Sequence, residues 1–114
     1  MIKKSFGASL QTTDTTLYEV PANKKAEWVL IYATDSGGST TDFSVDLYDA
    51  SETATLAVLN QYGLSAKDFF KLGGEPNAFT MMYAGDKIIA RCATNDAVTM
   101  LVSVIEYNDI IQGG

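Results

Sequence analysis

The chain has 114 residues, 46% of them hydrophobic, and its 8 Lys and Arg residues against 14 Asp and Glu residues give a net charge of −6 at neutral pH. These values predict one globular domain, residues 1–114, with a core that needs no metal or disulfide. The negative charge repels phosphate backbones and anionic lipid surfaces, so neither nucleic acid nor a membrane is expected as a partner. The sequence has no His, which excludes enzymes of the Ser-His-Asp and Cys-His types.

Residues 1–11 are predicted to form an N-terminal arm or the first strand of the domain. Two early lysines, Lys3 and Lys4, are not followed by the apolar run of about 7–15 residues that a secretory signal needs. We therefore expect the protein to be made and used without Sec export. No stretch of the sequence approaches the roughly 20 apolar residues of a membrane span.

Turn-forming clusters of Gly, Pro, Asn and Asp divide the chain into short segments rich in Val, Ile, Thr and aromatic residues, which is the composition of β-strands. In the clearest segment, residues 42–49, Phe43, Val45 and Leu47 alternate with polar residues, which predicts a half-buried strand. The Gly-rich segment 35–39 lacks the spacing of a phosphate-binding loop and is predicted to be a turn. The predicted strands are residues 15–20, 26–34, 42–49, 79–83, 87–94 and 98–107.

Residues 51–72 fit two structures. The Ala and Leu content of residues 52–62 fits a short helix, whereas Leu56, Val58 and a turn at Gly63 fit a strand. We favour a strand or an extended loop, because a lone helix of this length gains little stability without packing. Residues 67–72 are predicted to form a further strand.

The whole pattern predicts the fold class. Seven to eight short strands joined by long connections are typical of an antiparallel β-sandwich, and the expected type is a jelly roll. Residues 108–114 are predicted to be a flexible C-terminal tail.

Two predicted strands, residues 26–34 and 98–107, are apolar on both faces. An antiparallel sheet in a monomer usually leaves its outer face polar, so the second apolar face must be covered by another part of the chain or by another subunit. Residues 51–72 and the N-terminal arm are the candidates within the chain. The alternative is a protein interface, for which the predicted residues are Trp28, Leu30, Tyr32, Arg91, Leu101, Ile105 and Tyr107.

Carboxylates are the acid–base groups that the sequence supplies in quantity. Asp42 and Asp46 are predicted to share the exposed face of one strand, where nothing separates their pKa values into an acid and a base. An enzymatic function is therefore not expected, and no catalytic, cofactor-binding or metal-binding residue is predicted. A chance calcium site formed by Asp46, Asp49 and Glu52 near a turn remains an alternative.

Two single residues have simple predicted roles. Cys92, the only cysteine, is predicted to be a buried, unreactive side chain, because no His is present to activate it. Arg91, the only arginine, is predicted to form a salt bridge between strands or across an interface. Five aromatic residues could form a sugar-binding platform, but this is a weaker alternative to a role in the core or at an interface. They are Trp28, Tyr32, Tyr48, Tyr62 and Tyr107.

Two motifs carry a resemblance to a known type of protein. The pattern T-T-x-Y-x-V-P-A-x-K spans residues 15–24, and x-A-G-D-x-I spans residues 83–88. In this order, over roughly residues 12–107, the sequence resembles small β-sandwich accessory proteins of tailed-bacteriophage virions. The resemblance implies a capsid decoration (cement) protein, or a neck or tail component that bridges larger parts.

The resemblance also sets expectations for partners. It implies contacts with copies of the same chain and with larger virion proteins, a homo-oligomer, and a location in the virion after assembly in the host cytoplasm. The alternative function is a receptor- or carbohydrate-binding module of a phage tail or fibre. Apolar strand faces used for assembly favour the first function, whereas exposed aromatics beside a polar groove favour the second.

Overall fold

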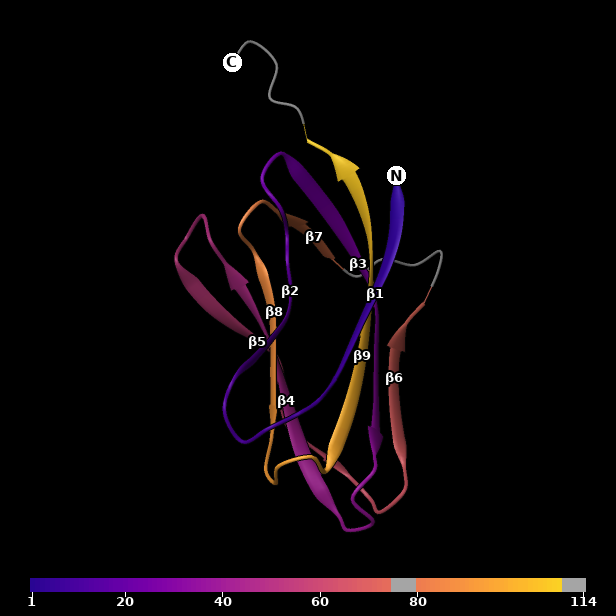
Figure 1. Cartoon of the computed structure of the whole chain (residues 1–114). Helices are drawn as coiled ribbons and strands as arrows, with labels where there is room; N and C mark the ends of the chain where they lie inside the picture. Colours follow the sequence, from indigo (N-terminus) through magenta and orange to yellow (C-terminus); the bar gives the residue numbers. More distant parts are fainter. Residues whose placement is uncertain (75–79, 110–114) are drawn as a thin grey trace.

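The computed structural model describes residues 1–74 and 80–109, and these residues form nine β-strands and no helix (Figure 1). The predicted all-β class is therefore confirmed. The strands are β1 (Ile2–Ser9), β2 (Thr15–Glu19), β3 (Lys24–Asp35), β4 (Thr41–Asp49), β5 (Ala54–Leu64), β6 (Phe69–Gly73), β7 (Thr80–Tyr83), β8 (Lys87–Cys92) and β9 (Val98–Asn108).

The strands form two antiparallel sheets. The first sheet has the order β1-β9-β3-β6, with β7 also paired to β3, and the second has the order β2-β8-β4-β5. The two short strands β6 and β7 pair with different halves of β3, residues 30–34 and 25–28. They therefore lie end to end along the same edge of the first sheet and together take the place of one strand. Counted in this way, the nine strands of the described residues fill eight places in the two sheets, and seven to eight strands were predicted.

Two segments for which the sequence left alternatives open form strands in the structure. Residues 1–11 contain a full strand, β1, which pairs along its whole length with β9. Residues 51–72 contain β5 and all of β6 except Gly73, so the strand interpretation is confirmed and the helix alternative is wrong. Phe79 of the predicted strand 79–83 and residues 110–114 of the predicted tail lie outside the described residues.

The core lies between the two sheets and is built from the alternate residues of each strand that face the opposite sheet. Trp28 is its largest fully buried side chain, with 0% of its surface exposed. It shares the core with Phe43 and Ile88 of the second sheet. Strict alternation instead predicted that Trp28 points outward, away from Ile31, and this prediction is wrong.

A β-bulge in β3 is the physical reason. Trp28 pairs with Val104 and Leu30 pairs with Ser103, so Val29 is an extra residue on β3 that has no opposite residue on β9. One inserted residue shifts the alternation by one position. Trp28 and Ile31 therefore both face the core, whereas Leu30 faces outward.

The two motifs of the sequence meet at one end of the molecule. The amide of Gly85 donates a hydrogen bond to the carbonyl of Val20, and the amide of Val20 donates one to the carbonyl of Asp86. The buried carboxylate of Asp86 accepts hydrogen bonds from the amides of Ala50 and Tyr83, both at 2.9 Å. Gly85 has φ 91°, which favours Gly. This corner ties three connections together.

Candidate interaction surfaces

The outer surface of the first sheet carries a group of apolar side chains, which we call the apolar face. Their outward direction follows from the register, because Tyr32 pairs with Leu101 across β3 and β9, on the side opposite to the core residues Ile31 and Val102. The apolar face consists of Leu30, Tyr32, Phe69, Leu101 and Ile105.

The centre of the apolar face is an aromatic contact. The rings of Tyr32 and Phe69 stack with their centroids 5.8 Å apart and their planes at 17°. Phe69 is 58% exposed, and neighbouring Leu101 is 38% exposed. Large apolar side chains that gather at one exposed place, rather than singly, are typical of an interaction surface.

The structure places the predicted interface residues in three different environments. Leu30, Tyr32, Leu101 and Ile105 lie on the apolar face, as predicted. The half-buried Tyr107 lies on the same surface of β9, where its hydroxyl donates a hydrogen bond to Glu27. Trp28 is in the core and Arg91 is on the other sheet.

Neither predicted cover within the chain lies over the apolar face. The N-terminal strand β1 and the strand β6 are hydrogen-bonded neighbours within the first sheet, and β5 belongs to the second sheet. All three extend the edges of a sheet and do not lie across this outer surface. Phe69, the most exposed member of the apolar face, was missed by the sequence prediction because its contact with Tyr32 depends on the long-range pairing of β6 with β3.

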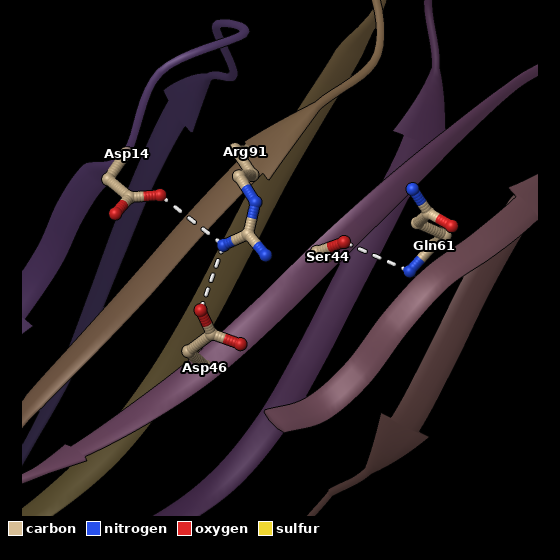
Figure 2. A network of polar contacts seen from close by, with 5 residues as sticks. All are labelled: Asp14, Ser44, Asp46, Gln61 and Arg91. Atoms are coloured by element: carbon tan, nitrogen blue, oxygen red, sulfur yellow. Dashed lines mark hydrogen bonds and ion pairs between the residues drawn. The ribbon is translucent and has the colours of Figure 1, made fainter. Parts of the chain in front are cut away.

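The second sheet carries a polar network on its outer surface (Figure 2). Arg91 on β8 donates from Nη1 to the Asp46 carboxylate at 2.8 Å and to the Asp14 carboxylate at 3.3 Å. The hydrogen bond with Asp46, opposed by partial burial, raises the pKa of Arg91 above its usual value. The predicted salt bridge of Arg91 between strands is therefore confirmed.

The sequence predicted Asp46 on the exposed face of β4. Its side chain does lie on the side opposite to the core residue Val45, but Arg91 covers it and leaves it only 10% exposed. Next to it, β4 and β5 pair with two irregularities on either side of Val45. At one of them Gln61 has φ 51°, and its amide donates a hydrogen bond to the buried hydroxyl of Ser44 at 2.9 Å (Figure 2).

A polar hollow of about 270 Å³ opens beside this network. It is lined mainly by hydroxyl, amide and charged groups from the β1–β2 connection and from β4, β5 and β8. Hydrogen-bond donors and acceptors in one hollow can orient a polar ligand. The lining residues are Thr12, Asp42, Ser44, Asn60, Gln61, Arg91, Cys92 and Ala93.

The alternative calcium site is not assembled. Asp46 is engaged by Arg91, and the Asp49 carboxylate accepts hydrogen bonds from the hydroxyl and the amide of Ser51. The hydrogen bond from the Ser51 hydroxyl lowers the pKa of Asp49. Within residues 1–74 and 80–109, no three Cys, Asp or Glu side chains form a group that could hold a metal ion.

The remaining predicted residues are dispersed. Cys92 is buried, as predicted, and its thiol lies 2.9 Å from the carbonyl of Thr94. The five aromatic residues considered for a sugar platform do not converge: Trp28 is in the core, Tyr48 lies under Lys87 on the second sheet, and Tyr62 packs against Phe43. A single aromatic platform built from this set is therefore excluded.

Comparisons with known proteins do not assign the chain to a family. No protein-family model matches it, and a search of curated proteins finds no significant relative. In the part of the chain that the structure describes, no helix is long and apolar enough to cross a membrane.

Proposed function

We propose that this chain is a non-enzymatic structural protein of a tailed-bacteriophage virion, which attaches to a larger virion protein through its apolar face. The observation that carries the proposal is the exposed stack of Tyr32 and Phe69 beside Leu101 on the outer surface of the first sheet. Aromatic residues are enriched at protein interfaces, and charged residues such as Lys71, opposite Tyr32, and Glu27, opposite Ile105, border the apolar face. Decoration of the capsid and bridging of neck or tail components are the two roles that this attachment fits.

The strand order supports the finer assignment of the fold. If β6 and β7 are counted together as position 6, β8 becomes position 7 and β9 becomes position 8. The first sheet then has the order 1-8-3-6 and the second has the order 2-7-4-5. From this order of two four-stranded antiparallel sheets we infer a jelly roll, a fold common in viral capsid proteins and lectins. Because one fold serves many functions, the jelly roll supports the virion role together with the motif resemblance and does not establish it alone.

The motif resemblance has a structural basis that supports the proposal. The V-P-A and A-G-D motifs lie at one corner. There the amide of Val20 donates a hydrogen bond to the carbonyl of Asp86, and the Asp86 carboxylate accepts hydrogen bonds from two amides. The resemblance is therefore carried by residues that shape the end of the sandwich. None of these residues belongs to the apolar face.

The first experiment tests the presence of the chain in virions. Particles purified from phage whose genome carries this gene are expected to contain the chain in many copies, as measured by quantitative mass spectrometry. Particles that are complete and infectious without the chain, and that do not bind it when it is added back, would overturn the proposal.

The second experiment tests the apolar face. Leu101→Lys places a charge beside the Tyr32–Phe69 stack and is expected to reduce binding to particles that lack the chain by at least tenfold, because charged residues are depleted at interface cores. Thr16→Lys, at an exposed position of β2 on the second sheet, is the matched control and should bind like wild type. Equal binding of both variants would exclude the apolar face as the attachment surface.

The polar hollow favours a second function, a receptor- or carbohydrate-binding module of a phage tail or fibre. The amide side chains of Asn60 and Gln61 are exposed beside Arg91 and Ser44, and groups of this kind bind sugar hydroxyls. A glycan array probed with the purified protein separates the two functions. Binding of a saccharide that Asn60→Ala abolishes and Leu101→Lys leaves intact would favour this second function.

A further inference from the structure

The strand β5 forms one edge of the second sheet. Among the described residues its only strand partner is β4, so alternate N–H and C=O groups along β5 point away from the sheet. Residues 54–57 pair regularly with residues 46–49 of β4, and the irregularities follow further along. We call residues 54–59 the β5 edge. Its length is that of an ordinary strand.

The β5 edge lacks most of the features that normally prevent edge-to-edge pairing. Proteins protect exposed edges with charged residues, Pro, very short strands or β-bulges, and of these β5 has only the bulges. The 11 residues of β5, ATLAVLNQYGL, include no charged residue and no Pro, although 19% of the chain is charged. One irregularity skips Val58, inside the β5 edge, and the other lies between Leu59 and Tyr62, so residues 54–57 are the regularly paired part of the β5 edge.

One side chain on this edge has no cover. Leu56 pairs with Leu47, so both point to the core-facing side of the second sheet. Leu47 packs against the core, whereas Leu56 is 52% exposed. In Figure 1 the β4–β5 hairpin lies at the left side of the molecule, away from the first sheet. The unpaired backbone and this uncovered leucine lie at the same place.

We propose that two copies of this chain pair through their β5 edges, antiparallel and related by a two-fold axis, so that the second sheet continues across both molecules. Such an isologous contact pairs the segment with itself. Because the segment is uncharged, no like charges meet at the contact, although each copy carries a net charge of −6. With the axis perpendicular to the sheet, the two Leu56 side chains lie on the same face and cover each other. This contact is separate from the apolar face.

The test is a sedimentation-velocity concentration series on the full chain. Wild type is expected to form a dimer, and Leu56→Lys is expected to weaken dimerisation at least tenfold, because two lysines would face each other at the new strand pair. The substitution changes the net charge from −6 to −5 (−6 + 1), which lowers the overall repulsion between copies. A loss of dimer would therefore reflect the local contact. Leu101→Lys makes the same change on the other sheet and should leave the dimer intact.

Hydrogen exchange supplies a second readout that does not depend on a variant. Amides in residues 54–59 are expected to exchange more slowly at high protein concentration, and those of β1 are not. Three outcomes would overturn the proposal. The first is a wild type that stays monomeric at about 1 mM, and the second is a dimer that Leu56→Lys does not weaken and that leaves exchange in residues 54–59 unchanged. The third is protection of these amides only when particles are added, which would identify a strand of another virion protein as the occupant. Particle binding by Leu56→Lys tests the virion role separately.

Discussion

Trp28 shows how one residue can reverse the interpretation of a strand. By simple alternation it belongs to the outer face with Leu30 and Tyr32, yet the bulge at Val29 turns it into the core. Its indole Nε1 donates a hydrogen bond at 3.1 Å to the carbonyl of Leu30, inside the bulge. The indole thus fills the core and also stabilises the irregular backbone that places it there.

Trp28→Ala is expected to destabilise the fold and not to remove an interface. Truncation of a fully buried aromatic side chain costs about 3–5 kcal/mol, whereas a substitution at an exposed site such as Leu101→Ala typically changes stability by less than about 1 kcal/mol. Urea denaturation of the two variants measures the difference. A Trp28→Ala protein as stable as wild type would contradict the core position of the indole.

At the scale of elements, the sequence predicts strands well and strand faces less well. The observed strands β2, β4 and β9 match the predicted segments 15–20, 42–49 and 98–107 to within one residue at each end. Such strands are predictable because β-branched and aromatic composition is a local property. Bulges are not local, since they depend on the partner strand. For that reason Trp28 was predicted to face outward and instead faces the core. Asp46 stays on the predicted side of β4 and is buried because Arg91 of the neighbouring strand covers it.

The corner at Asp86 provides a prediction about how the connections are held. Asp86→Ala would leave the amides of Ala50 and Tyr83 without their acceptor, and unsatisfied buried polar groups cost about 1–3 kcal/mol. Chemical denaturation is expected to show a loss of that size. Asp86→Asn keeps one carbonyl oxygen and should lose less. If both variants match wild type, the corner does not depend on this carboxylate.

At the scale of the whole molecule, the candidate surfaces were predictable only in part. Four residues of the apolar face lie on two strands whose second apolar face was visible in the sequence. Phe69 and the polar hollow were not predictable, because each depends on segments brought together by long-range pairing. The hollow combines residues from four separate parts of the chain, none of which carries a motif of its own.

A buried hydrogen bond that joins the two sheets through a carboxylate was also not predictable. Glu106 of the first sheet is almost fully buried and accepts a hydrogen bond from the hydroxyl of Tyr18 on the second sheet at 2.6 Å. Lys4 on β1 lies 3.1 Å from its other oxygen. Burial opposes ionisation of Glu106, but the contacts with Tyr18 and Lys4 outweigh it and lower the pKa of the carboxyl. Burial and the same hydrogen bond raise the pKa of Tyr18.

This link predicts a pH-dependent contribution to stability. Because the pKa of Glu106 is lower in the folded state than in the unfolded chain, the contribution is fully present above the usual carboxyl pKa and disappears as the pH falls through the lowered value. Glu106→Gln should therefore reduce the free energy of unfolding by about 1–3 kcal/mol at pH 7, and the difference from wild type should shrink in acid. Glu19→Gln, at an exposed position of β2, is the control and should show little difference at either pH. Urea denaturation at neutral and acidic pH measures both differences. If the difference in free energy of unfolding between wild type and Glu106→Gln stays constant down to the lowest pH at which the protein folds, the charge of the carboxylate does not stabilise the contact between the sheets.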